Sequence, residues 1–233
     1  MVSTRSPKVT AGFFSFTEVE EGEHHSYNEW HLYDHQPEQF VLPGIAWGQR
    51  WVLPPRLRSR ASASSPLDRT HYVTLYLLAE PLDRTLADFM ALGWHLAEVG
   101  RFHLKRTSHL AGPLAVSSLH AAPRVAVGPE AVPYRPGTGA HVRVLPAGAE
   151  SGRPEALLDV PGVAGAWTFA GGATAAGPLA DLQVVWCWLD GDPMEVAAAL
   201  DGVAPRPPHD ARVWFTGTLE TVDPSGPWDW FDR

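Results

Sequence analysis

Cysteine is almost absent from this chain: Cys187 is the only one among 233 residues. A single cysteine excludes an intrachain disulfide framework and fits a reducing compartment, so we expect a cytoplasmic protein. Cys187 lies between Trp186 and Trp188 on an apolar stretch without the electropositive surroundings that a nucleophilic thiolate needs. It is therefore predicted to be a buried packing residue.

Lysine is scarce too, and long apolar runs are missing. Lys8 and Lys105 are the two lysines, and the formal net charge is −8. This acidic balance argues against an extended nucleic-acid surface, which needs clustered basic side chains. No apolar run approaches the roughly 18 residues that cross a bilayer, and the polar start does not resemble a signal peptide. We expect neither nucleic acid nor a membrane as a partner.

Motifs for bound organic cofactors are also missing. There is no phosphate-cradling glycine-rich loop, no dinucleotide fingerprint, no G-x-S-x-G elbow and no cysteine-based metal motif. The sequence therefore predicts no cofactor. Tryptophan, by contrast, is abundant, with ten residues. So many indole rings imply either a heavily aromatic core or an aromatic-lined cavity.

The first half of the chain has the pattern of a β-α-β-β-α-β module. Ser26 and Glu29 have the spacing of a capping box, which predicts a helix from Tyr27 to Gln36 that Pro37 ends or kinks. The other expected elements are strands at 11–17, 45–53, 70–79 and 101–106 and a helix from Asp83 to Val99, stopped by Gly100. This order is the ferredoxin-like arrangement.

The second half resembles a worn copy of the first. Residues 42–51 are echoed by 160–169, and residues 72–80 by 182–190. A helix from Pro193 to Leu200 and a strand from Arg212 to Thr221 complete the order. We therefore predict an α+β protein of two ferredoxin-like repeats, with the first at 1–106, a connector at 107–139, and a degenerate second repeat at 140–233.

Such modules pair through the uncovered faces of their sheets, which predicts a barrel of the dimeric α+β kind. Whether this barrel closes within one chain or between the two chains of a homodimer is left open by the sequence. The final segment, 226–233, carries three aromatic residues and is expected to pack back on the barrel.

A family resemblance is carried by Asn28-Glu29-Trp30, Asp34-His35, Pro37-Glu38 and Pro43-Gly44. Together they resemble the motif of EthD-like proteins. The resemblance implies a dimeric α+β barrel with a cavity between sheet and helices. Relatives include proteins linked to ether degradation, cofactor-free monooxygenases, polyketide cyclases and lactone isomerases. It does not imply one reaction, because the fold hosts many.

His35 is the main chemical candidate, since a histidine titrates near neutral pH and can act as a general acid or base. The carboxylate of Asp34 or of Glu38 is a candidate to orient it, and His31 shares its helix face four residues earlier. The alternative for His35 is a structural role at a helix end, where the helix dipole favours a charged imidazole.

Histidines are also frequent enough near this helix to raise the question of a metal. His24 and His25 precede it, and the His31–His35 spacing with Glu38 suits Zn²⁺ or Fe²⁺. A haem ligated by one of these histidines is a further alternative. The family motif requires no residue like His31, so we expect no metal.

Aromatic residues at alternating strand positions share one sheet face. They predict a pocket for a flat apolar ligand, although ordinary barrel core is the competing interpretation. The candidate ligand-binding residues are Phe14, Phe16, Trp30, Trp47, Trp51, Tyr72 and Tyr76. Arg50 is expected to face solvent, and the Arg-rich segment 54–69 is expected to be a solvated, mobile loop.

Three functional hypotheses follow. The first is a small-molecule enzyme without an organic cofactor, in which His35 transfers protons on a hydrophobic aromatic or polyketide-like metabolite during an isomerisation, cyclisation or oxygenation. The second is a non-catalytic protein that binds a hydrophobic metabolite. The third is a metal- or haem-dependent member of the same fold.

Overall fold

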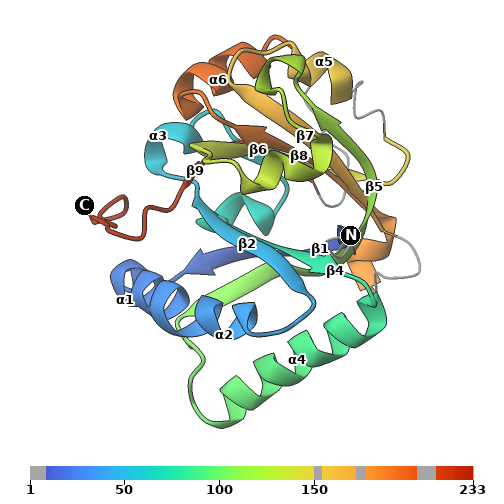
Figure 1. Ribbon diagram of the computed structural model, residues 1–233. Helices are drawn as coiled ribbons and strands as arrows, with labels where there is room; N and C mark the ends of the chain where they lie inside the picture. Colours follow the sequence, from blue (N-terminus) through green and yellow to red (C-terminus); the bar gives the residue numbers. More distant parts are fainter. Residues whose placement is uncertain (1–8, 150–153, 172–176, 204–213, 233) are drawn as a thin grey trace.

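Eight antiparallel strands close into a barrel within one chain (Figure 1). The computed structural model describes residues 9–149, 154–171, 177–203 and 214–232. The barrel strands are β1 Val9–Val19, β2 Ile45–Val52, β4 Tyr72–Ala79, β5 Arg106–Ala121, β6 Gly139–Pro146, β7 Val163–Ala170, β8 Leu182–Leu189 and β9 Phe215–Thr221. Around the ring they follow the order β2-β4-β1-β5-β7-β8-β6-β9, and pairing of β2 with β9 completes the circle. The short β3, Ser62–Ala63, pairs with β9.

Helices cover the outside of the barrel in two groups (Figure 1). The first half carries α1 His24–Trp30, α2 Gln36–Phe40 and the long α4 Leu82–Glu98. The second half carries α5 Pro154–Leu158 and α6 Pro193–Leu200, whereas α3 Pro55–Arg58 follows β2. No helix in the described ranges is long and apolar enough to span a bilayer.

The two halves of the barrel have the same strand order. The first half is arranged β2-β4-β1-β5 and the second β7-β8-β6-β9. In each half, the strand that comes first in the sequence therefore stands third in the sheet. The predicted strands at 11–17, 45–53 and 70–79 and the helices from Asp83 and Pro193 are confirmed. Gly100 follows α4 with a φ of +74°, as a helix stop requires.

The predicted strand at 101–106 is wrong in position. β5 runs from Arg106 to Ala121, so the predicted connector 107–139 begins as a barrel strand. Small and polar residues hide the strand pattern there, because β5 is buried on one face only over part of its length. In the second half β9 begins at Phe215, and the predicted start at Arg212 lies outside the described residues.

The interior of the barrel is packed with aromatic rings from both halves. Trp51 of β2 and Trp186 of β8 have ring centroids 4.6 Å apart, and Phe14 of β1 lies 5.9 Å from Trp186. All three side chains are buried. Cys187 is buried too, as predicted, and burial raises the pKa of its thiol to about 12. Five of the ten tryptophans belong to the barrel core or pack against it: Trp47, Trp51, Trp167, Trp186 and Trp188.

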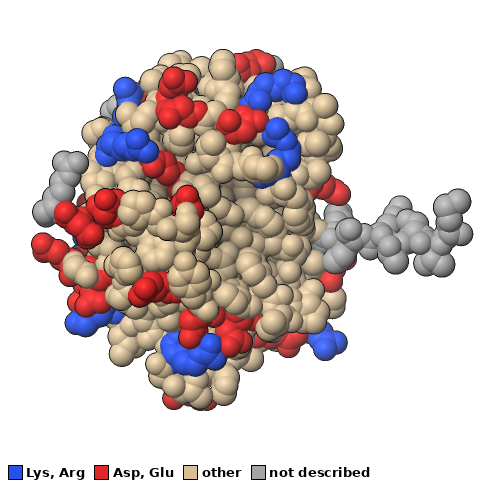
Figure 2. Space-filling model, turned by 60° about the vertical axis from the view of Figure 1, so that its left-hand side comes forward, with Lys and Arg blue, Asp and Glu red and all other residues tan. Residues whose placement is uncertain are grey.

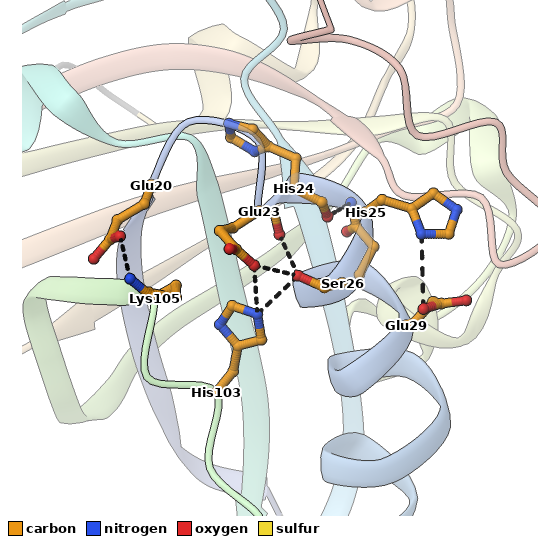
Figure 3. Close-up of polar contacts among 9 residues, drawn as sticks. Glu20, Glu23, His24, His25, Ser26, Glu29, His103 and Lys105 are labelled. Carbon is orange, nitrogen blue, oxygen red and sulfur yellow. Dashed lines mark hydrogen bonds and ion pairs between the residues drawn. The ribbon is translucent and has the colours of Figure 1, made fainter.

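The predicted capping box at the first helix is wrong. The helix begins at His24, so Ser26 already lies within its first turn. The Ser26 hydroxyl donates to the backbone carbonyl and to the carboxylate of Glu23, and Glu29 faces His25 at 3.7 Å (Figure 3). Ser26 also contacts His103, which anchors this helix start to the segment before β5.

Proline does not end this helix. Between α1 and α2 the residues His31–His35 form a π-helical turn, and the helix continues through Pro37 to Phe40. Proline cannot donate a backbone hydrogen bond, and its ring collides with the carbonyl four residues before it. The wider turn accommodates this defect, and such turns are frequent at functional sites.

The segment 54–69 is ordered and packed, which corrects the prediction of a mobile loop. Leu57 and Leu67 are buried in the barrel core. Arg58 donates to the carbonyls of Asp68 and Thr70, and Arg56 pairs with Glu220 at 2.6 Å. The arginines therefore bind this segment to itself and to β9.

The aromatic C-terminal segment packs back on the first half, as predicted. Trp228 is buried beside Val19 and Tyr27, and Phe231 stacks on His24 with ring centroids 4.2 Å apart. The segment therefore contacts the first residues of α1, and in Figure 1 the C-terminus lies on the same side of the molecule as α1.

Candidate functional site

A cavity of about 510 Å³ lies between the outer face of the first-half sheet and its helices. Its floor comes from β1, β4 and β5, and its walls from α1, the π-helical turn, α2 and α4. Most of the lining is apolar. The lining residues are Phe13, Ser15, Tyr27, Trp30, His31, His35, Gln39, Thr74, Tyr76, Phe89, Met90, Gly93, Trp94, Ala97, Glu98, Phe102, Arg106, Ser108 and Ala111.

His35 lines this cavity at the end of the π-helical turn. Its ring stacks on Trp30 with centroids 4.5 Å apart and 23° between planes, and meets Phe102 edge-on at 5.3 Å. The Nδ1 atom is enclosed and has no hydrogen-bond partner within the described part of the chain. Nε2 is thus the nitrogen left to reach a ligand.

His31 lines the same wall, with its ring centroid 5.5 Å from that of His35. It is buried, and its Nδ1 also has no partner among the residues that the structure describes. Asp34 does not orient either ring: its carboxylate accepts two hydrogen bonds from Arg101, at 3.0 and 3.2 Å. Of the three predicted catalytic residues, His31 and His35 are together at the cavity and Asp34 is at its outside.

Both cavity histidines are held in the neutral form. Burial is the largest cause and, with the nearby Arg106, lowers the pKa of His35 from 6.5 to about 4, against a smaller opposite effect of Asp34. Burial, followed by the charge of Arg50, lowers the pKa of His31 well below its ordinary value. At neutral pH each imidazole can therefore accept a proton but is a weak base until a ligand changes its surroundings.

The lowered pKa of His35 predicts acid-sensitive stability. Between pH 6.5 and 4 the unfolded chain binds a proton at His35 that the folded chain excludes, so stability falls as the pH falls. His35 alone should lower the free energy of unfolding by about 3 kcal/mol when the pH reaches 4. Urea unfolding should therefore show that the free energy of unfolding falls less between pH 7 and pH 4 in His35→Gln than in the wild type. The exposed His25, changed to Gln, is the matched control, and an unchanged loss in His35→Gln would contradict the prediction.

Arg106 is the cavity-lining cation that sequence reasoning missed. Its guanidinium lies over Trp30 and Phe102, 5.3 and 4.7 Å from the ring centroids, and donates to the Ser108 hydroxyl. These are the same two rings that hold His35. The residue was hidden at the presumed end of a short strand, although its place at the start of β5 directs it to the helices.

Arg50 is buried and does not face solvent, which corrects a second prediction. Its guanidinium lies 5.0 Å from the ring of Tyr27 and 5.3 Å from that of Tyr72, and donates to Asn28 at 2.6 Å. Burial lowers its pKa, which the surrounding tyrosines partly oppose. Arg50 thus places a positive charge just behind the cavity wall.

The aromatic residues predicted to bind a ligand do not all lie in one pocket. Trp30 and Tyr76 line the cavity. Phe14, Phe16, Trp47 and Trp51 do not line this cavity: they belong to the barrel core or pack against it, and Trp47 and Trp51 line a separate small pocket of about 40 Å³. Alternation along β1 gives the reason, since Phe14 and Phe16 face inward and Phe13 and Ser15 face the helices. Tyr72 faces the helices but lies under α1, where its hydroxyl meets His24 and Asn28.

The four histidines weighed as metal ligands do not converge. His24 bonds Tyr72, while His25 faces Glu29 on the outside of α1, and their rings point in different directions (Figure 3). Within the described ranges no group of three or more His, Cys, Asp or Glu side chains is placed to hold a metal ion. The cavity thus offers His31 and His35 alone.

Comparison with known proteins identifies the fold. No protein-family model matches the sequence, and no curated protein matches it. Among solved structures, the chain is similar to a candidate chlorite dismutase, with a TM-score of 0.52, 10% identity and coverage of 97% of this chain and 99% of that chain. It is also similar to the encapsulated DyP-type peroxidase from Mycobacterium smegmatis, with a TM-score of 0.50, 10% identity and coverage of 99% and 97%.

These similarities extend over nearly the whole chain at low identity. They show a mixed α+β fold built on an eight-stranded antiparallel barrel, which this chain shares with those two structures. Since one fold hosts many reactions, the activity has to be argued from the cavity.

Proposed function

We propose that this protein is a small-molecule enzyme that works without an organic cofactor and uses His35 as a general acid and base. The observation that carries the proposal is a neutral imidazole in the wall of an apolar cavity of about 510 Å³, beside Arg106. Pockets of this size and polarity suit a drug-sized ligand. The ligand class is a hydrophobic aromatic or polyketide-like metabolite.

The proposed chemistry begins with proton transfer to His35. A ligand with an acidic C–H or O–H bond gives its proton to Nε2, and the electron pair stays on the ligand as an enolate or phenolate. The positive charges of Arg106 and of the buried Arg50, which both act on His35, favour that anion in a cavity of low polarity. Return of the proton to another atom completes an isomerisation or a cyclisation, and reaction of the carbanion with O₂ would begin an oxygenation.

We also infer that the two halves are ferredoxin-like repeats from a tandem duplication, and that the first is EthD-like. Their identical strand order and the echoed segments support this. The boundary then falls after β5, so the linker runs from Ala122 to Thr138 instead of 107–139. The barrel closes within one chain, so the proposed cytoplasmic enzyme does not need a homodimer to complete it.

A metal- or haem-dependent function has two neutral imidazoles beside an apolar cavity in its favour. Histidines that ligate metals almost always donate their other ring N–H to a carboxylate, a carbonyl or water. Nδ1 of His35 has no carboxylate or carbonyl partner in the described part of the protein. Arg106 is also the one arginine or lysine among the described lining residues, whereas haem carries two carboxylates. The residues present do not fit a haem.

One experiment separates the three functions. We expect purified protein, dialysed against a chelator and without a Soret band, to convert at least one member of a panel of hydroxylated aromatic and polyketide-like compounds, as measured by mass spectrometry. Ligand-dependent quenching of tryptophan fluorescence without conversion would instead support a binding protein. Conversion that appears only after haemin or a metal salt is added would overturn the cofactor-free proposal.

A further inference from the structure

We infer that the ligand of this cavity is an anion, namely a carboxylate attached to an otherwise apolar ring system, with the carboxylate bound at Arg106 and the rings between β1 and α4. This inference rests on the proposed function for the location of the site and names the chemical class of its substrate. Four features of the cavity lead to it.

First, Arg106 lacks a carboxylate partner. Its Nη1 donates to Ser108 at 2.9 Å, while its Nε is buried without any partner among the described residues. An arginine that is partly withdrawn from water, with an unused donor, loses hydration that an anionic ligand would replace. The planar guanidinium offers parallel N–H groups, which match the two oxygens of a carboxylate.

Second, the acidic residues around the cavity are already engaged or lie in solvent. Asp34 and Glu38 both bind Arg101, at 3.0 and 2.8 Å. Glu98 lines the rim of the cavity and is exposed. No described carboxylate therefore pairs with Arg106, and a bound anion could serve as its counter-ion.

Third, the polar groups of the floor gather at the Arg106 end. Ser108 of β5 contacts Ser15 of β1 at 3.1 Å, and Ser15 in turn contacts Thr17 at 3.1 Å. Thr74 of β4 is paired with Ser15 across the sheet. Hydroxyl groups beside a guanidinium provide further donors to a bound carboxylate.

Fourth, the opposite end of the floor is aromatic and apolar. Phe13 of β1 packs on Phe89 of α4 with ring centroids 4.7 Å apart, and Tyr76 lies 5.4 Å from Phe89. Met90 and the 69%-exposed Trp94 continue this wall along α4. A ligand that is charged at one end and composed of flat rings at the other matches both ends at once.

The fixed charge behind the wall adds to this preference. Arg50 is buried near Tyr27, a lining residue, and has no carboxylate partner in the described ranges. The protein as a whole carries a net charge of −8, and in Figure 2 basic side chains lie near the outline, interspersed with acidic ones. Although the protein is acidic as a whole, the positive charges of Arg50 and Arg106 therefore favour the binding of anions in the cavity.

The inference is tested with two probes of nearly the same shape, of which only the first is charged: anthraquinone-2-carboxylate and anthraquinone-2-carboxamide. Equilibrium dialysis with the full chain at pH 7.5 should show the carboxylate binding at least about tenfold more tightly, since hydrogen bonds to charged groups are the stronger ones. Arg106→Gln should weaken carboxylate binding about 10- to 100-fold and leave carboxamide binding within about twofold. Arg106→Lys should retain part of the preference because it keeps the charge. Arg101→Gln, an arginine already neutralised by Asp34 and Glu38, is the matched control and should change neither affinity.

Equal affinity for the two probes, equal losses in Arg106→Gln, or no binding of either probe would overturn the inference. Carboxamide binding and thermal unfolding of Arg106→Gln show whether the variant is folded. The same binding measurement on His35→Gln separates the ligand class from the proposed catalysis, because binding of the carboxylate does not require proton transfer. A carboxylate preference that survives there, combined with no turnover of any compound by the wild type, would overturn the proposed catalysis and leave the ligand class standing.

Discussion

Replacing His35 with alanine is expected to lower turnover by about 10²- to 10⁴-fold, the usual contribution of a general acid or base. The ring removed is the one whose Nε2 can reach the cavity, and its replacement leaves Trp30 and Phe102 in place to bind the ligand. The effect should therefore appear in kcat, with KM changed little. Steady-state kinetics on a compound converted by the wild type measures it.

His25→Ala is the matched control, because His25 lies on the outside of the same helix and faces Glu29. It should retain full activity. Asp34→Asn should retain most of its activity too, since Asp34 binds Arg101 and not His35. Retained turnover in His35→Ala, in protein with wild-type circular dichroism and thermal unfolding, would exclude His35 as the acid or base and shift the search to His31.

Much of the fold could be predicted because its signals are local. β4, β2 and α4 carry β-branched, aromatic or helical spacing within the element itself, and each was located within a few residues. β5 was misplaced because its residues are small and polar, and its burial depends on strands far away in the sequence. Barrel closure between β2 and β9 could not be predicted at all, since it depends on how the two halves twist around one core.

The site was predictable only in part, for a similar reason. The motif around His35 pointed to the correct helix, and the spacing to His31 pointed to the correct face. Alternation along β1 says which residues share a face but not which face meets the helices, so Phe14 was chosen where Phe13 lines the cavity. Arg106 stands 71 residues from His35 in the sequence, and only the antiparallel pairing of β1 with β5 brings it near.

The assignment of the barrel interior as core leads to a large expected effect on stability. Trp186→Ala should lower the free energy of unfolding by about 3–5 kcal/mol, the usual cost of removing a large buried aromatic side chain. Trp186 is fully buried and contacts Trp51 and Trp188, with ring centroids 4.6 and 5.8 Å away. Its Nε1 has no hydrogen-bond partner among the described residues, so the loss is one of packing. Urea unfolding followed by circular dichroism measures it.

Trp94→Ala is the matched control, because this tryptophan is 69% exposed on α4 and should change stability by no more than about 0.5 kcal/mol. Trp94 lines the cavity, so its replacement should instead weaken the binding of aromatic ligands. If the barrel interior were the ligand site, the pattern would be reversed: Trp186→Ala would lose binding with little change in stability. Trp186 packs on rings from both halves, so its loss should also lower the midpoint of one common unfolding transition and not of one half alone.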